Sequence, residues 1–238
     1  MKSDVRPVVL PGSPPLTIFV RRSAKAKRLS LKILQHSGGR IELSIPNSCS
    51  VGTATEFALS KEPWIRNSLK KIPPVCKPQI GSKFPVEGKL LRIAVGNGNA
   101  IVRTETELRV PNTADSVAEH ILYWGMQLAS ERTKCAAAKY VERLGGLNPV
   151  NRISIKDPVS RWGSCSSKGN LMVSWRLIMA PFDVMEYVVA HEVAHLKVMD
   201  HSNCFWATLE EIFPNHVAPD NWLKRNGASL HRYDFSIN

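Results

Sequence analysis

The stretch Tyr187-Val188-Val189-Ala190-His191-Glu192-Val193-Ala194-His195 decides most of what this chain of 238 residues can be. His191 and His195 are four residues apart, and residues four apart lie on the same face of an α-helix. Two imidazoles on one face can bind a single metal ion, and Glu192 lies beside them without being a ligand. This His-Glu-x-x-His pattern is typical of zinc hydrolases in which the glutamate is the general base.

The residues around the motif predict a buried helix. Six of the eight residues from Tyr187 to Ala194 are apolar, and a helix that is apolar on all sides belongs in a protein core. Asp183 followed by Glu186 predicts the N-cap of this helix. Polar side chains inside such a helix are costly without partners, and metal ligation would supply them. The alternative is a core helix whose histidines are merely hydrogen-bonded.

His201 is the favoured third ligand, ten residues after the first histidine. A catalytic zinc takes three protein ligands and leaves a fourth position for water. Glu210 and Glu211, which we expect on the next helix, remain rival third ligands. Cys204 is a soft donor that could also bind zinc, although a buried thiol without a metal is the commoner role.

Two segments resemble those of a known family. The first is Arg161–Asn170, with the sequence RWGSCSSKGN, followed by Trp175–Pro181, with the sequence WRLIMAP. The second is His191–Trp206, which contains HEVAHL and DHS. Together they resemble the YgjP-like metallopeptidases, a family related to the SprT-like and WLM zinc peptidases. The resemblance is weaker along the rest of the chain, and at about residues 75–110 it is loose.

The resemblance implies a zincin-like catalytic core of the minigluzincin type. It implies one Zn2+ ion per chain, bound by His191, His195 and His201, with Glu192 as the general base. Asp200 stands where relatives commonly have asparagine, and this difference leaves the implied ligand set unchanged.

Patterning predicts an α+β protein in two parts. Residues 1–111 are expected to form a β-rich basic subdomain. Residues 112–238 are expected to form the zincin-like domain, with the active-site helix packed beside a small antiparallel sheet. Alternating apolar residues predict strands at 16–22, 28–35, 40–46, 90–95, 100–103, 107–111, 151–156, 162–165 and 171–177. Helices are expected at about 52–71 and from a capping box at Ser116 to about 144.

Candidate substrate-binding residues lie on the expected strand at 162–165 and near the C-terminus. In zincins a sheet edge lies beside the metal helix, so Trp162, Gly163 and Ser164 could bind an extended peptide by strand addition. Core packing of this hairpin is the alternative. Tyr233 or His231 could stabilise the developing oxyanion, and Arg161 or Arg176 could do the same or bind substrate. Packing of the tail and surface ion pairs are the alternative roles for these four side chains.

The net charge of +12 is unevenly distributed. Residues 1–77 hold fourteen Lys/Arg against four Asp/Glu, and a cluster at residues 21–28 contains five of these cations. Such asymmetry favours an anionic partner, so nucleic acid is a candidate partner of this third of the chain. A solvated basic face is the alternative, and no aromatic residues interleave with the cluster to stack on bases.

The remaining composition predicts a cytoplasmic protein. Its five cysteines are scattered, without a C-x-x-C pair. The chain has no apolar run of about 18 residues and no secretory h-region, so we expect no membrane segment. The oligomeric state has no signature in the sequence.

These observations predict a zinc metallopeptidase acting on a protein or peptide substrate. One alternative is a metal-dependent hydrolase of nucleotide phosphoanhydrides, whose phosphates the basic third would bind. Histidine ligands argue against it, because phosphate chemistry usually uses magnesium held by carboxylates. Another alternative is a nucleic-acid-associated protein in which the zinc is structural.

Overall fold

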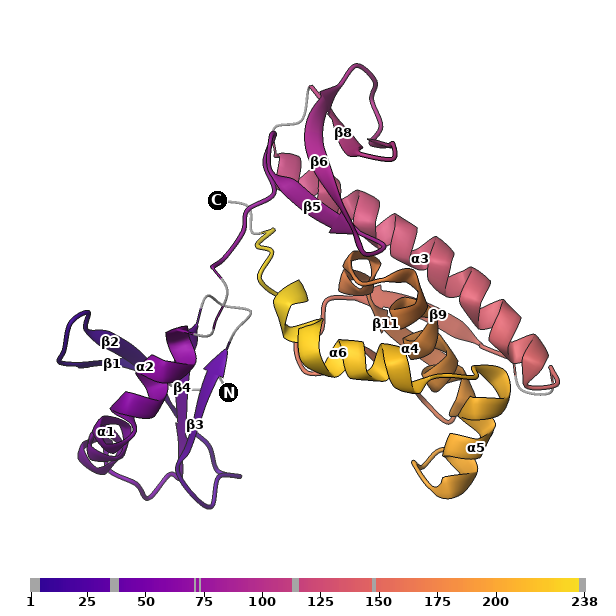
Figure 1. Cartoon of the computed structure of the whole chain (residues 1–238). Coiled ribbons are helices and arrows are strands. Elements are labelled where there is room, and N and C mark those ends of the chain that lie inside the picture. Colours follow the sequence, from indigo (N-terminus) through magenta and orange to yellow (C-terminus); the bar gives the residue numbers. More distant parts are fainter. Residues whose placement is uncertain are drawn as a thin grey trace. The chain divides into compact units, whose positions relative to one another are not determined.

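The computed structural model describes residues 5–34, 39–70, 72, 74–112, 116–146 and 149–235. Helices and small sheets alternate along it, so the expected α+β class is confirmed (Figure 1). The chain divides into one unit from Met1 to Val75 and a second from Cys76 to Asn238. None of the helices in these described ranges is long and apolar enough to cross a membrane.

The first unit is a four-stranded sheet with two helices on one face (Figure 1). The strand order is β1 (Val5–Leu10), β2 (Leu16–Arg22), β4 (Arg40–Ile45) and β3 (Ser30–Leu34). The helices are α1 (Val51–Ser60), which contacts β1 and β4, and α2 (Glu62–Lys70), which contacts β3. Alternate residues of β2, namely Leu16, Ile18 and Val20, are buried in the core of this unit.

Two features of the first unit differ from the sequence-based expectation. The chain passes from β2 to the edge strand β3 before it returns as β4, so β2 and β4 pair in parallel. The helix expected at about 52–71 is two helices, because Lys61 caps the end of α1 and Pro63 is the second residue of α2. Proline has no N–H to donate inside a helix, but it fits the first turn of a new one.

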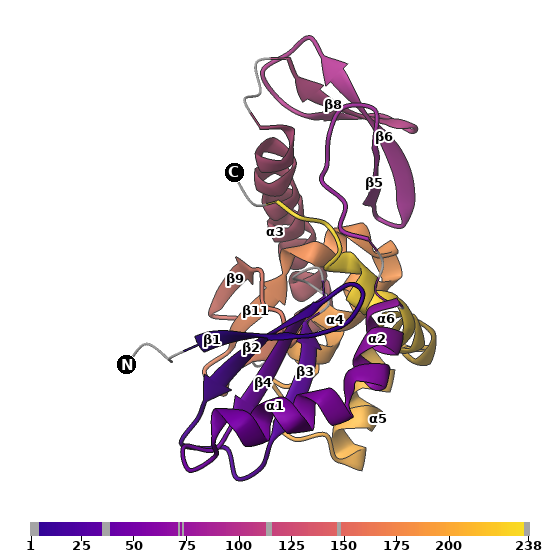
Figure 2. The ribbon, with the colours of Figure 1, turned by 90° about the vertical axis from the view of Figure 1, so that its left-hand side faces the viewer.

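The second unit contains two sheets and four longer helices among its described residues (Figure 2). One sheet has the order β5 (Lys83–Val86), β6 (Lys89–Gly96), β8 (Glu107–Pro111) and β7 (Val102–Arg103). The other has the order β10 (Gly163–Cys165), β11 (Asn170–Ser174) and β9 (Arg152–Lys156). The helices are α3 (Val117–Arg143), the 3-10 helix η2 (Trp175–Met179), α4 (Phe182–Ala194), α5 (Asn203–Ile212) and α6 (Val217–Leu230).

The expected boundary between residues 111 and 112 is wrong, because the β5–β8 sheet belongs to the second unit. Phe84, Ile93 and Leu108 share one hydrophobic core with the residues of α4. β5 contacts η2, and β8 contacts α3. The strands of this sheet bury their apolar face against η2 and α3. Separating the sheet from these helices would therefore expose the core.

The small sheet beside α4 is also not wholly antiparallel. β10 and β11 form the expected antiparallel hairpin, whereas β9 pairs with β11 in parallel. β11 then runs into η2, where an extended strand to residue 177 was expected. This sheet leaves β10 as an edge strand, and β10 contacts α4.

Trp175 is fully buried against α3, and Gly125 makes room for it. A Cβ atom at Gly125 would lie 2.9 Å from Cζ3 of that indole. We therefore expect Gly125→Leu to lower the free energy of unfolding by about 1–3 kcal/mol, the usual cost of overpacking a core. Gly98→Leu is the matched control, because nothing lies within 4 Å of the added Cβ. Urea unfolding measures both, and equal stability of the two variants would contradict this packing.

Candidate metal centre

α4 carries the motif through the core of the second unit. It contacts α3, α5, α6, η2, β10 and β11, and nine of its thirteen residues are buried. The helix begins at Phe182 after Pro181, and no side chain caps it. Asp183 therefore lies inside the first turn, and the expected cap at this residue is wrong. An acidic residue there still favours the helix, because it faces the positive end of the helix dipole.

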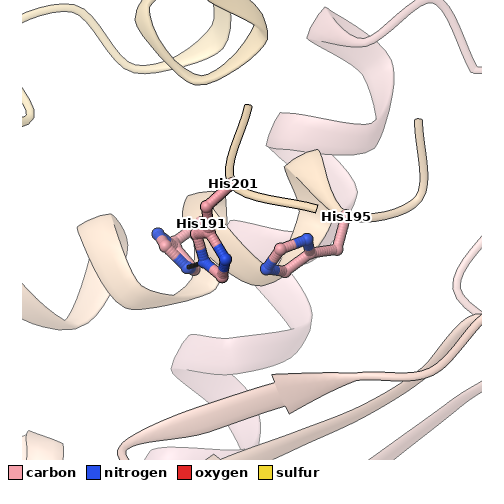
Figure 3. A group of neighbouring side chains, drawn as sticks. All are labelled: His191, His195 and His201. Carbon is pink, nitrogen blue, oxygen red and sulfur yellow. Dashed lines mark hydrogen bonds between the residues drawn. The ribbon is translucent and has the colours of Figure 1, made fainter. Parts of the chain in front are cut away.

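Three imidazoles converge at the end of α4 (Figure 3). His191 lies in the last turn, His195 caps the helix, and His201 comes from the loop before α5. Their ligand atoms all lie within 4.8 Å of one another, and Nε2 of His191 is 3.1 Å from Nε2 of His201. Nitrogen ligands of one tetrahedral zinc lie about 3.3 Å apart, so this spacing fits a shared ion.

The protonation of the imidazoles also fits a metal. Burial lowers the pKa of His191 to about 4, helped by the charges of the other two histidines, and burial also lowers the pKa of His195. Neutral rings keep a lone pair for a ligand bond. Nδ1 of His195 lies 3.0 Å from the carbonyl oxygen of Val198, to which it can donate, so its Nε2 is left as the ligand atom.

The rival third ligands lie elsewhere. Among the described residues, the three histidines are the one group of three or more metal-binding side chains that converge. The carboxylate of Glu210 lies 3.1 Å from Nε2 of His216, and Glu211 is exposed on α5. Cys204 is an exposed, free thiol. The geometry therefore favours His201 over all three.

Glu192 is buried beside the small sheet, with 7% of its surface exposed. Burial raises its pKa to about 7, while a backbone hydrogen bond from Cys165 and the charge of Arg161 act in the opposite direction. A Cβ atom at Gly163 would lie 2.6 Å from Oε1 of Glu192. The missing side chain of Gly163 thus makes room for the carboxylate of Glu192. The sequence had instead led us to expect that Gly163 makes room for the backbone of a bound peptide.

The other two candidate residues of this segment, Trp162 and Ser164, are the neighbours of Gly163 in sequence. Ser164 lies in β10 and pairs with Met172 of β11. The Trp162 ring lies 5.0 Å from the ring of His231 and against Gly227 of α6. Trp162 and His231 therefore pack on each other.

Arg176 and Tyr233 hold the C-terminal segment in place. The guanidinium of Arg176 binds both carboxylate oxygens of Asp157, at 2.6 and 2.9 Å. It also donates to the backbone carbonyls of Leu230 and Tyr233, at 3.0 Å each. The ring of Tyr233 lies edge-on to Phe84, 5.3 Å away. Both side chains thus have the packing and ion-pair roles that were the alternatives for them.

Sequence reasoning missed two aromatic contributors to the site. Phe205 of α5 is fully buried, and its ring lies 4.5–4.8 Å from each of the three imidazoles. Tyr187, one turn before His191, donates its hydroxyl proton to Asp220 of α6 at 3.1 Å. The spacing 187–191 was a usable signal for Tyr187, because residues four apart share a helix face. Phe205 carried no such signal.

The helix, the adjacent carboxylate and the three imidazoles define a site of the metal-dependent hydrolase class. Residues 27–226 match the YgjP-like family, described as a YgjP-like metallopeptidase domain. The chain therefore belongs to the YgjP-like metallopeptidase family, and it is a metal-dependent peptidase by family.

The crystal structure of the metallopeptidase zymogen of Pyrococcus abyssi abylysin is similar at 24% sequence identity, with a TM-score of 0.36. The similarity covers 39% of this chain and 93% of that one. No curated protein matches the chain.

We expect His201→Ala to lose bound zinc, because two imidazoles leave the ion without a third protein ligand. Glu210→Ala and Glu211→Ala are the matched controls and should keep about one ion per chain. Metal analysis of the purified proteins by mass spectrometry measures this directly. Loss of zinc in a glutamate variant, with zinc retained in His201→Ala, would overturn the ligand set.

Proposed function

We propose that this protein is a zinc peptidase in which His191, His195 and His201 hold one ion and Glu192 is the general base. The observation that carries the proposal is the buried carboxylate of Glu192, next in sequence to the first of three converging imidazoles. Three imidazoles suit zinc better than magnesium or calcium, which prefer oxygen ligands. When bound, the zinc would act as a Lewis acid toward water and the substrate carbonyl.

Glu192 would move the proton during peptide hydrolysis. Its carboxylate takes a proton from the attacking water and returns it to the nitrogen of the departing amine. The N–H of Cys165 and the charge of Arg161 act on this carboxylate, and Gly163 leaves it space. The carboxylate is thus oriented before substrate arrives, which spares the cost of arranging it in the transition state.

A zincin-like arrangement would place the substrate along β10. Trp162 and Ser166 are hydrogen-bonded to Ser174 and Asn170, at the two ends of the hairpin ladder. Bonded positions alternate in an antiparallel pair, so the backbone groups of Gly163 and Cys165 face the free edge. The Cys165 N–H reaches Glu192 there, and the Gly163 backbone is left for a peptide added as a further strand.

Arg161 is the arginine best placed to assist the reaction. It is exposed, and its charge acts on Glu192. Arg176, in contrast, uses its donors on Asp157 and two backbone carbonyls. We therefore propose Arg161, and not Arg176, as a substrate-binding side chain.

Glu192→Gln keeps the shape of the side chain but removes the base. We expect zinc content to stay at the wild-type level and the rate of casein hydrolysis to fall about 10²- to 10⁴-fold, the usual contribution of general base catalysis. Nucleoside triphosphates assayed beside casein, with zinc and with magnesium, test the phosphohydrolase alternative. Undiminished peptidase activity in the zinc-loaded variant would contradict the proposal, as would triphosphate hydrolysis without proteolysis.

Gly163→Ala tests the orientation of the carboxylate. The added Cβ must displace Glu192, and a shift of about 1 Å can lower a rate about 100-fold. We expect kcat to fall to that extent while zinc content is unchanged. Gly52→Ala is the control, because its Cβ would meet only ordinary contacts, the nearest at 3.6 Å. Wild-type kcat in Gly163→Ala would show that this close approach has no catalytic role.

A further inference from the structure

A groove lies in the first unit, far along the chain from the metal motif. It is lined by Arg28, Leu29, Ser30, Leu31, Phe57, Lys61 and Trp64, and its volume is about 490 Å³. The lining comes from β3 with the residues before it, from α1 and from the start of α2. α2 contacts β3 in the same unit, so this arrangement belongs to the fold of the unit itself.

The groove combines aromatic faces with cations. The Trp64 side chain is half exposed, at 50%, although it extends from a helix whose neighbouring Ile65 is fully buried. The Lys61 ammonium lies 5.8 Å from the centre of the Phe57 ring, within the range of a cation–π contact. Arg28 and Lys61 are exposed and form no ion pair with any described acidic residue.

The part of the chain that contains the groove is strongly basic in sequence. Residues 1–75 hold thirteen Lys/Arg against four Asp/Glu, a balance of +9. Two of the acidic residues, Glu42 and Glu62, already pair with Arg40 and Arg66. The cations of residues 21–28 therefore keep their attraction for an external anion, and Arg28 brings the end of that cluster to the groove.

We infer that this groove binds single-stranded nucleic acid, with bases stacked on Trp64 and Phe57 and phosphates bound by Arg28, Lys61 and the neighbouring cations. Aromatic platforms in a positively charged groove are the usual means of binding single strands without strong sequence preference. The absence of aromatic residues among residues 21–28 had argued against stacking. The fold removes this objection, because α1 and α2 supply the rings.

An acidic peptide added to the β3 edge would use the same charge but fits the lining less well. Only Ser30 and Leu31 of the lining belong to β3, since Arg28 and Leu29 precede the strand. Strand addition needs a continuous backbone edge, whereas base stacking needs the ring faces that this groove offers.

Fluorescence anisotropy of a labelled twelve-nucleotide thymidine strand, titrated with the full chain, tests the inference. We expect Trp64→Ala to weaken binding about 5- to 100-fold, the range for loss of one stacked base, and Trp64→Phe to retain most of the affinity. Arg28→Ala and Lys61→Ala should each weaken binding and reduce the slope of log K against log salt by about 0.7 per lost phosphate contact. A double-stranded form of the same length should bind more weakly, because its bases are already stacked.

The controls separate this groove from general charge and from catalysis. Tyr123→Ala removes an aromatic side chain that is 59% exposed on α3, and Lys83→Ala removes an exposed cation of β5; both should bind like the wild type. Glu192→Gln should also bind normally, so failure of the proposed peptidase function leaves this result intact. Thermal unfolding of each variant identifies any loss of folding.

Three results would overturn the inference. One is the absence of binding to the thymidine strand at 50 mM salt. Another is wild-type affinity in both Trp64→Ala and Arg28→Ala, which would leave only a solvated basic face. The third is a twelve-residue polyglutamate that binds at least as tightly as the thymidine strand and is weakened by Trp64→Ala, which would make the groove a peptide site.

Discussion

The burial of polar groups within α4 is the constraint on which the rest of the second unit depends. An apolar helix in the core holds the Glu192 carboxylate and the His195 imidazole with a hydrogen-bond partner each, because a buried polar group without a partner is costly and an unpaired buried charge costs several kcal/mol. Those partners come from separate parts of the chain. The Cys165 N–H reaches the carboxylate, and the Val198 carbonyl lies at hydrogen-bond distance from Nδ1 of His195. The edge strand and the loop after α4 therefore both position these polar side chains and supply their hydrogen-bond partners.

Packing around the site makes this arrangement of side chains rigid. Phe205 of α5 lies against all three imidazoles, so this helix restricts the orientation of their rings. Arg176 joins the residue after β9 to the end of α6 through Asp157 and the carbonyl of Leu230. These contacts surround a helix that also meets the long α3. A site built on such elements holds its geometry better than one built on mobile loops.

Local pattern predicted the parts of the structure that depend on local physics. The bounds of β2 and β8 match the expected strands, and Ser116 caps α3 through the N–H of Glu119. The helix of the motif and the convergence of three histidines also followed from spacing. Long-range features did not, because periodicity carries no information on which strand is a neighbour. The parallel pairs, the boundary at Val75 and the contact of Gly163 with Glu192 each depend on residues far apart in sequence.

The central claim is that three imidazole nitrogens hold one ion, and X-ray absorption at the zinc edge tests it most directly. The zinc-loaded full chain should give three imidazole nitrogens at about 2.0–2.1 Å and no sulfur ligand. A zinc–sulfur distance of about 2.3 Å, which would bring a cysteine such as Cys204 into the site, would contradict the claim. A protein that binds no ion when folded in the presence of zinc would contradict it equally.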